Sequence, residues 1–307
     1  AAAALADAVG QAKAGLDPAR VGFVVVGLAG GAALPSGADL PGGEAFAQVW
    51  EHAGIRCPVE YEGDALIAFV AGSDQPEGSL LLSGTGAVAI AVKDRAMAAR
   101  SDGHGWLLGD RGSGFWLGRR AVIAAMAELD GEGPPTALTG LVIGSLLSGG
   151  TDPGSAAAAP GTEPEPDPSL PRPSPTPVAA RDLVAAVMSQ PPPNLARLAP
   201  LVATACAAGD PVARRIADRA AEHLAATLSV VREPAATTPI VLAGSILTNP
   251  TPVAERVRAA LAARWPDAPL TPALDGAAAA VWLALDRAGR PPEPAVRARL
   301  FSVSTAS

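Results

Sequence analysis

Three glycine-rich turns in this chain each follow a short apolar segment of the kind that forms a buried strand. They are LLLSGTG at 80–86, GHGWLLGDRGSG at 103–114 and IVLAGS at 240–245. In an open α/β sheet, ligands collect at the carboxyl ends of the strands, where backbone N–H groups point at anions and glycine allows close approach. One such turn is a weak signal, but three in this order predict a site for a negatively charged ligand.

Two aspartates stand where a carboxylate could take part in chemistry. Asp64 follows a predicted strand and precedes an apolar helix. Its position alone favours a helix N-cap. The other role is to accept the proton of an attacking hydroxyl group in phosphoryl transfer, which needs little beyond positioning and charge stabilisation. Asp110 lies within the second glycine-rich turn, where it either binds vicinal sugar hydroxyl groups or hydrogen-bonds its own backbone.

The other candidates near these turns give weaker signals. His104 lies in the second turn, but a lone His usually has a structural role, and no second His or Cys stands nearby in the sequence to complete a metal site. We therefore predict no metal-binding residue. Trp106 and Trp116 flank the turn, where their rings either stack against a bound sugar or pack in the core. His52 and His223 fall on predicted helices, and we assign them no role.

The elements that must position these residues alternate between strands and helices, which indicates the α/β class. Continuous apolar runs predict buried strands, and apolar residues every three or four positions predict helices. The predicted strands are 21–27, 59–61, 79–83, 88–92 and 239–243, and the predicted helices are 5–16, 44–53, 65–71, one starting near 115, 181–189, 195–208, 211–232, 252–265 and 276–288. Pro, Gly, Ser, Thr and Ala dominate from about 149 to 176, which predicts a disordered insertion with too little apolar surface to bury.

Composition narrows the function further. The 307 residues suffice for one large domain or two smaller lobes, and no apolar run approaches the length of a membrane span, so we expect a soluble globular protein. A net charge of −7 with 5 Phe and 1 Tyr argues against a nucleic-acid surface and against a basic membrane-binding helix. Cys57 and Cys206 lie far apart without a CxxC pattern, which indicates reduced thiols in a cytoplasmic protein.

Four segments of the chain resemble the BadF/BadG/BcrA/BcrD ATPase family, and within it the N-acetylglucosamine and glucosamine kinase branch. They are LLLSGTGAVAIAV, DGHGWLLGDRGSGFWLGRRAV, PIVLAGSILTNP and LDGAAAAVWLAL, and the resemblance covers nearly the whole chain apart from the Pro-rich insertion. The resemblance implies a two-lobed, ribonuclease-H-like fold of the actin, hexokinase and Hsp70 type with ATP in the cleft. It places lobe I at 1–78, lobe II with its ATP and sugar loops at 79–275, a helix at 276–289 packed back on lobe I, and a tail at 290–307.

The same resemblance implies roles for individual residues. Asp64, in YEGDALIAF, is similar to the family's catalytic aspartate, which deprotonates the primary hydroxyl of the sugar. The resemblance therefore favours a catalytic role for Asp64 over a helix-capping role. The implied contacts to ATP are Gly84, Thr85 and Gly86 at the phosphates and Gly244, Ser245 and Thr248 at adenosine, and those to the sugar are Gly103, His104, Gly105 and Asp110. The implied reaction is phosphorylation of an amino sugar, N-acetylglucosamine first, to its 6-phosphate. ATP and Mg²⁺ are the cofactors, with the ion held mainly by the nucleotide, and the family also implies a homodimer.

Two departures from the family pattern affect these expectations. Arg111 stands where family members usually carry Glu in GDEGS, which leaves the exact sugar open. The family opens with a strand pair that carries a DGGGT-type phosphate motif, but no such motif precedes Val21, the expected sugar-binding Asn is absent, and the chain starts without Met. We therefore expect the N-terminal strands of lobe I to be missing from this sequence. The chain as given is then predicted to be inactive or poorly folded, and the complete gene product to be a kinase.

Other functions stay open at this point. Glucosamine, glucose or a less usual amino sugar could replace N-acetylglucosamine. The ATPase activators of 2-hydroxyacyl-CoA dehydratases and benzoyl-CoA reductases belong to the same family, but they carry an iron–sulfur cluster between two subunits, and Cys57 and Cys206 do not match its ligand pattern. A non-catalytic sugar sensor would fit the missing front end. Regulators of this fold normally add a DNA-binding helix-turn-helix, however, and no basic recognition helix is predicted.

Overall fold

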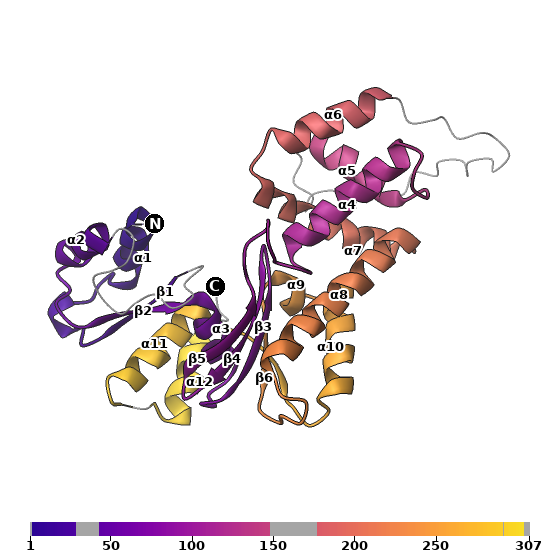
Figure 1. Cartoon of the computed structure of the whole chain (residues 1–307). Helices are drawn as coiled ribbons and strands as arrows, with labels where there is room; N and C mark the ends of the chain where they lie inside the picture. The colour runs from indigo at the N-terminus through magenta and orange to yellow at the C-terminus, as the bar shows by residue number, and fades with distance from the viewer. Residues whose placement is uncertain (1, 29–42, 148–176, 291, 304–307) are drawn as a thin grey trace.

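The strands of the chain lie in two sheets, as Figure 1 shows for a computed structural model that describes residues 2–28, 43–147, 177–290 and 292–303. The smaller sheet pairs β1 (Val24–Leu28) in parallel with β2 (Val59–Gly63). The larger sheet has five strands in the order β5-β4-β3-β6-β7. Strands and helices alternate along the chain, which confirms the predicted α/β class.

The central strand of the larger sheet decides where the glycine turns lie. This strand, β3 (Gly78–Ser83), pairs antiparallel with β4 (Ala87–Lys93) on one side and parallel with β6 (Ile240–Ala243) on the other. Because parallel strands end at the same edge of a sheet, the turns that follow β3 and β6 are neighbours. Two strands were not predicted: β5 (Ala96–Asp102) and β7 (Leu270–Pro272).

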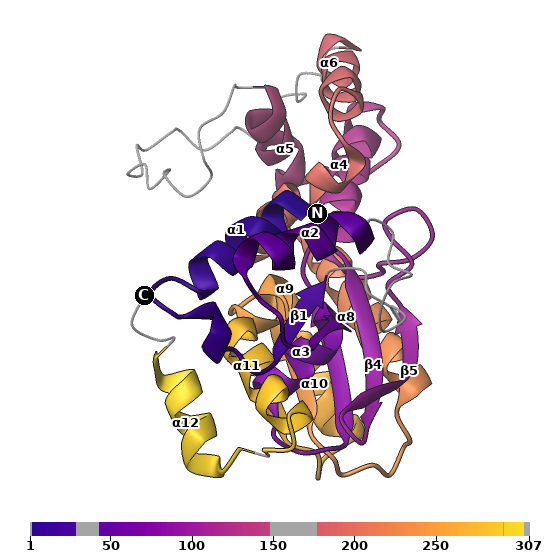
Figure 2. The same ribbon diagram turned by 90° about the vertical axis from the view of Figure 1, so that its left-hand side faces the viewer.

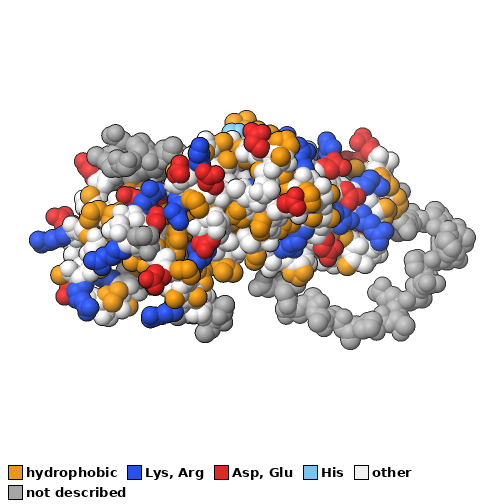
Figure 3. Space-filling model, turned by 90° about the horizontal axis from the view of Figure 1, so that it is seen from below, with side chains coloured by type: hydrophobic (Ala, Val, Ile, Leu, Met, Phe, Trp, Pro, Cys, Tyr) orange, Lys and Arg blue, Asp and Glu red, His pale blue; other side chains and the backbone are white. Residues whose placement is uncertain are grey.

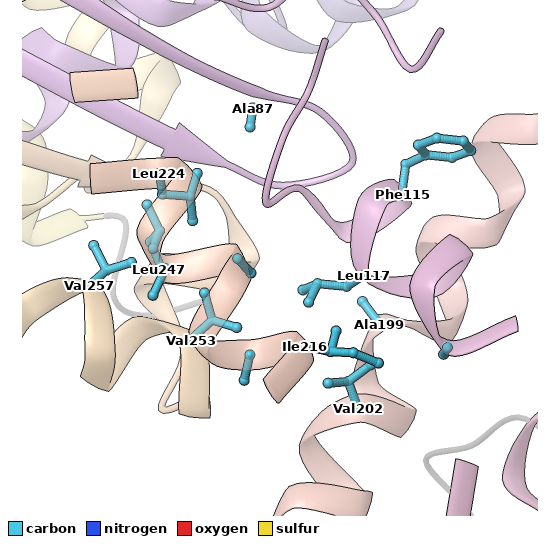
Figure 4. Close-up of a cluster of buried hydrophobic side chains, with 14 of the residues drawn as sticks. Ala87, Phe115, Leu117, Ala199, Val202, Ile216, Leu224, Leu247, Val253 and Val257 are labelled. Carbon is cyan, nitrogen blue, oxygen red and sulfur yellow. The ribbon is translucent and has the colours of Figure 1, made fainter. Parts of the chain in front are cut away.

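Helices cover both faces of the larger sheet (Figures 1 and 2). On one face, α3 (Asp64–Gly72) and α11 (Gly276–Arg287) pack through a core of apolar side chains that includes Phe69, Ile90 and Trp282. On the second face α8 (Pro211–Val231) packs against β3, β4 and β5, α10 (Pro252–Arg264) packs beside α8, and the short α9 (Ser245–Thr248) follows β6. The remaining helices of this half form a group beyond the end of the sheet that packs on α8 through one larger apolar core (Figure 1): α4 (Gly114–Leu129), α5 (Ala137–Leu147), α6 (Pro177–Met188), η2 (Pro192–Leu198) and α7 (Ala199–Ala207). Part of that larger core is drawn in Figure 4, where side chains from β4, α4, α7, α8, α9 and α10 meet.

The smaller sheet has its own helices. These are α1 (Ala2–Ala12) and α2 (Gly43–Ala53), with the short η1 (Pro18–Arg20) between α1 and β1. Leu5, Phe46 and Trp50 form a separate apolar core there, and the indole N–H of Trp50 donates to the Tyr61 hydroxyl at 2.7 Å. Helix α11 contacts both β1 and α3, so it links the small sheet to the large one.

The long helices begin at residues that suit a helix start. Ser113, Asp210, Thr251 and Asp275 are the N-caps of α4, α8, α10 and α11, and each side chain accepts a hydrogen bond from a backbone N–H in the first turn. Pro occupies the first turn of α8 and α10, where its missing N–H costs nothing. Helix α8 is 21 residues long and buries one stripe, which includes Ile216, Ala220 and Leu224, as its sequence period predicts.

Four further observations complete the fold. The predicted disordered insertion at 149–176 lies outside the described residues. The stretch 290–307, expected only as a tail, contains α12 (Pro294–Val303), whose Leu300 and Phe301 pack against the α3–α11 core. None of the helices within the described parts of the chain is long and apolar enough to cross a bilayer. On the face drawn in Figure 3, acidic and basic side chains are interspersed.

Candidate active site

The turns after β3 and β6 pack directly against each other. Gly84 donates its N–H to the carbonyl of Gly86 at 2.9 Å, and the Gly84 and Thr85 carbonyls accept from Gly114 and Phe115 at 2.7 and 3.2 Å. Gly244 has φ +82° and ψ 150°, a conformation essentially reserved for glycine. A side chain on Gly244 would place its Cβ 2.3 Å from the Ser83 carbonyl oxygen. The two turns therefore form one compact backbone surface at the strand ends, where an anion can be approached by main-chain atoms.

A cavity of about 430 Å³ adjoins this backbone surface. Its lining includes Gly84 and Thr85 from the first turn, Ser245 from the second, and apolar side chains of α7 and α10 such as Val202 and Val253. Thr248 does not line this cavity; its hydroxyl donates to the Gly244 carbonyl at 3.0 Å and closes the one-turn helix α9. A mostly apolar pocket beside glycine turns has the chemistry to hold a flat base with its phosphates directed to the turns.

Asp64 opens onto a second, larger cleft of about 1440 Å³. It is the first residue of α3, and the N-cap is Gly63, which makes no side-chain cap. The Asp64 carboxylate instead accepts a hydrogen bond from the neighbouring Ala65 N–H at 2.8 Å. Burial raises the pKa of Asp64, and this effect outweighs the opposite effects of the Ala65 N–H and of Arg100. Gly244, Ser245 and Thr248 line the same cleft, so Asp64 shares it with the turn after β6.

The second glycine-rich turn is a loop from Gly103 to Gly112 between β5 and α4, organised by the carboxylate of Asp102. Asp102 has only 2% of its side chain exposed. Its Oδ1 accepts from the N–H groups of Gly103 at 2.8 Å and Asp110 at 2.6 Å, and its Oδ2 accepts from the N–H of Arg111 at 3.1 Å. One side chain therefore holds both ends of this loop together, and Asp102 and Asp110 both adopt positive φ.

Asp110 connects the loop at 103–112 to the turn after β3. Its Oδ1 accepts from the Ala87 N–H at 3.2 Å, and a Cβ on Gly86 would lie 3.0 Å from its Oδ2. Burial raises the pKa of Asp110, and the nearby Asp102 carboxylate raises it further, whereas the Ala87 N–H and Arg100 lower it. The side chain is thus a buried acceptor at the edge of the glycine turns.

The structure brings some of the predicted site residues together and leaves others apart. Gly84, Thr85, Gly86, Gly244, Ser245 and Asp110 form one continuous group. Gly103, His104 and Gly105 line neither of the two cavities described above, and His104 is exposed. Arg111, which departs from the family pattern, points its Nε to Asp102 Oδ2 at 3.6 Å, so an acidic residue at 102 accompanies the basic one at 111.

Two residues escaped the sequence reasoning. Asp102 could have been noticed, because an acid at the end of a strand directly before a Gly-X-Gly loop is a common loop organiser. Arg100 carried no sequence signal, since a single Arg on an edge strand usually faces solvent. Within the described residues, no group of three or more His, Cys, Asp or Glu side chains could hold a metal ion. Cys57 packs near the small-sheet core, whereas Cys206 lies in the large core.

Several known proteins are similar to this chain. An N-acetylmuramic acid/N-acetylglucosamine kinase from Clostridium acetobutylicum is 37% identical over 83 residues, which cover 27% of this chain and 27% of that protein. An N-acetyl-D-glucosamine kinase from Dictyostelium discoideum is 28% identical over 129 residues, which cover 41% of this chain and 38% of that protein. The chain thus matches between about a quarter and two fifths of the length of these relatives.

Solved structures show the same fold. A candidate N-acetylglucosamine kinase from Chromobacterium violaceum superposes with a TM-score of 0.59 at 21% identity, covering 89% of this chain and 80% of that one. Another from Porphyromonas gingivalis gives a TM-score of 0.56 at 20% identity, covering 92% and 82%. The model of the BadF/BadG/BcrA/BcrD ATPase family matches residues 1–283, and the chain therefore belongs to this family.

Proposed function

We propose that the protein is an ATP-dependent kinase that phosphorylates the primary hydroxyl of an amino sugar, with N-acetylglucosamine as the first choice. The observation that carries this proposal is the meeting of three features at one sheet edge. These are the paired glycine turns at Gly84 and Gly244, the Asp110 carboxylate bonded beside them, and the cleft that Asp64 shares with the turn after β6. Membership of an ATPase family and the names of the relatives support the choice of ATP and of an amino sugar.

In this proposal ATP occupies the cavity of about 430 Å³, with its base among Val202, Val253 and their neighbours. Its phosphates lie along the backbone of Gly84, Thr85 and Gly86, whose N–H groups suit an anion. Gly244, Ser245 and Thr248 flank the nucleotide from the other turn. Mg²⁺ is bound mainly by the phosphate oxygens, as is usual for this ion, and we assign no residue of the chain as its ligand.

The chemistry assigned to Asp64 is that of a general base. The Asp64 carboxylate removes the hydroxyl proton, the freed oxygen attacks the γ-phosphorus, and the bond from that phosphorus to the β-phosphate oxygen breaks to release ADP. A carboxylate whose pKa is raised by burial holds a transferred proton better than an ordinary one. Asp110, with Gly103, His104 and Gly105, is assigned to the sugar hydroxyl groups, which makes the loop at 103–112 the sugar loop of this proposal.

The activator of a CoA-dependent dehydratase or reductase is the second candidate from the same family. A cluster shared by two subunits needs two suitably placed thiolates in each subunit. Cys57 and Cys206 lie in different hydrophobic cores, which disfavours this candidate. We also propose, on the family resemblance alone, that the kinase is a cytoplasmic homodimer.

The decisive experiment measures ADP release by the protein with Mg-ATP and N-acetylglucosamine, glucosamine, glucose or no sugar. Asp64→Asn is compared with Asp267→Asn, which alters an exposed Asp. We expect sugar-dependent turnover that falls by about 10²- to 10⁴-fold in Asp64→Asn, the usual range for loss of a general base, and stays unchanged in Asp267→Asn. ADP release that ignores the sugar and the Asp64 substitution would contradict the proposal.

A further inference from the structure

Arg100 of β5 belongs to the charged groups around the proposed site, although no motif includes it. We propose that Arg100 is a positioning residue of the sugar kinase reaction: its guanidinium fixes the start of the sugar loop and sets one positive charge near both Asp64 and Asp110. This inference rests on the proposed function. It adds a residue that orients the sugar loop and whose positive charge favours the ionised form of the two carboxylates.

The register of the sheet directs Arg100 toward Asp64. Arg100 lies opposite Ile90, and Asp102 lies opposite Val88. Ile90 and Val88 both pack into the core that the sheet shares with α3. Because alternate side chains of a strand share a face, Arg100 lies on the sheet face that α3 covers, and Asp64 is the first residue of α3.

The Arg100 guanidinium binds two backbone carbonyl groups where the sugar loop begins. Arg100 Nε donates to the Asp102 carbonyl at 3.0 Å, and Nη2 donates to the Gly103 carbonyl. A Cβ on Gly103 would lie 3.0 Å from Nη2, so glycine at 103 leaves room for this contact. The planar guanidinium can hold two carbonyl groups in a fixed geometry, which an ammonium group cannot do equally well.

The charge of Arg100 acts on both proposed functional carboxylates. Burial raises the pKa of Asp64 and of Asp110, and the positive charge of Arg100 opposes this rise at each of them. The charge of Arg100 acts on Asp64 at the start of α3 and on Asp110 of the sugar loop. The carboxylate of Asp102, at the end of β5, pairs instead with Arg111, which has 55% of its side chain exposed. Arg100 is therefore the cation that the two carboxylates share.

Two substitutions separate the charge from the hydrogen bonds. Arg100→Gln removes the charge, so the pKa of Asp64 should rise and the acid limb of the kcat profile should move to higher pH. Arg100→Lys keeps the charge, so the acid limb should stay in place. Both variants lose the paired hydrogen bonds to the Asp102 and Gly103 carbonyls. Both should therefore raise the KM for the sugar by roughly 10-fold while leaving the KM for ATP unchanged.

Arg119→Gln, at an exposed position of α4, is the matched control for the loss of one positive charge and should behave as the parent enzyme. Thermal unfolding shows whether each variant is folded. If Arg100→Gln does not fold, Arg100→Lys still tests the paired hydrogen bonds to the two carbonyl groups. A parental sugar KM in Arg100→Lys would then overturn the proposal. An acid limb and a sugar KM that both stay parental in Arg100→Gln would overturn it as well.

The two proposals fail in different ways. Absence of sugar-dependent ADP release in the parent enzyme contradicts the kinase function, and with it the role of Arg100 in that reaction. Sugar-dependent release in the parent, with Arg100 variants indistinguishable from it, contradicts the role of Arg100 alone and leaves the kinase function standing.

Discussion

The Oδ1 atom of Asp110 accepts a hydrogen bond from the backbone N–H of Ala87 at 3.2 Å. Ala87 is the first residue of β4 and directly follows the Gly84–Gly86 turn, whereas Asp110 belongs to the loop that leaves β5. One contact therefore joins the loop proposed for the sugar to the turn proposed for the phosphates. A sugar bound by Asp110 would be placed relative to the γ-phosphate by the backbone of a single sheet, which is the positioning that phosphoryl transfer depends on.

Asp110→Asn should therefore act on sugar binding. The Asn oxygen can keep the bond from Ala87, but its amide group would replace the second acceptor oxygen, which lies beside Gly86. Losing a hydrogen bond to a charged acceptor costs about 1.5–3 kcal/mol, so the KM for the sugar should rise by roughly 10- to 100-fold. Steady-state kinetics with the sugar varied checks this, with Asp130→Asn at an exposed position as the control. A parental KM would argue against sugar contact at Asp110.

Two glycines with nearly equal φ allow a matched test of the close approach between the turns. Gly244 has φ +82° and Gly105 has φ +83°, but a Cβ on Gly244 would lie 2.3 Å from the Ser83 carbonyl oxygen, whereas a Cβ on Gly105 meets nothing within 4 Å. Gly105→Ala should lower the free energy of unfolding by about 1–2 kcal/mol, the strain of a left-handed residue.

Gly244→Ala should cost about 1–3 kcal/mol more than Gly105→Ala, because the added methyl group forces β3 and β6 apart. It should also raise the KM for ATP, since the displaced turn lines the proposed nucleotide cavity. Urea unfolding of both variants gives the comparison. Equal stabilities for the two variants would show that the approach of the two turns contributes nothing to the fold.

Much of the fold could be predicted from apolar patterns. The strand predicted at 239–243 has a continuous apolar run and the long helix predicted at 211–232 has a clear helical period, and the structure confirms both as β6 and α8. Strand β5 was missed because its sequence, AMAARSD, lies at the sheet edge and exposes several residues, so it lacks a continuous apolar run. Strand β7 has three residues and ends in Pro, which reads as loop; only its pairing with β6 makes it a strand.

The proposed site was predictable where backbone conformation requires a residue type. Gly244 and Gly103 are needed for positive φ or close approach, so the glycine turns mark the site in the sequence. Asp102 binds the backbone N–H of Asp110 eight residues along the chain, and the charge of Arg100 acts on Asp64 of another element, so no local pattern records either relation. For the same reason, the relation of Asp64 to the turn after β6 emerged only from the cleft that they share.

Arg297 should stabilise the protein by tying the last helix to α3. Its Nη2 donates to the carbonyls of Val70 and Ala71 at 2.8 and 3.4 Å, in the last turn of α3, and its guanidinium lies over the Phe301 ring at 4.6 Å. Arg297→Met keeps most of the packing but removes the donors, so the free energy of unfolding should fall by about 1–3 kcal/mol. Arg299→Met, at an exposed position of the same helix, should change it little.

The same two variants test whether α12 takes part in catalysis. Helix α12 lies beyond residues 1–283, the part that matches the family model, and Arg297 contacts the end of α3 remote from Asp64. The KM values for sugar and ATP should therefore stay parental in Arg297→Met. Calorimetric unfolding and steady-state kinetics on one preparation give both readouts. An unchanged unfolding temperature would contradict the bracing role, and an altered sugar KM would show that α3 transmits the contact to Asp64.

Asp210 should make the stability of the larger core depend on pH. Its Oδ1 caps α8 through the Ala213 N–H at 2.8 Å, and its Oδ2 accepts from the Thr136 hydroxyl at 2.9 Å and the Ala137 N–H at 2.7 Å at the start of α5. Burial acts to raise the pKa of Asp210, but these hydrogen bonds outweigh it and lower the pKa. The folded pKa then lies below the unfolded one, so the stabilisation is complete above about pH 4 and is lost as the pH falls through the folded pKa.

Asp210→Asn keeps one acceptor oxygen and so loses the contacts to one of the two helices. At pH 7 the free energy of unfolding should fall by about 1–3 kcal/mol. The difference from the parent should shrink as the pH approaches 3, because Asp210 of the unfolded parent then binds a proton more readily than Asp210 of the folded parent. Urea unfolding between pH 7 and pH 3 measures this, with Asp17→Asn at the N-cap of the exposed helix η1 as the control. A difference that stays constant over this range would mean that the geometry of the side chain, and not its charge, holds α5 and α8 together.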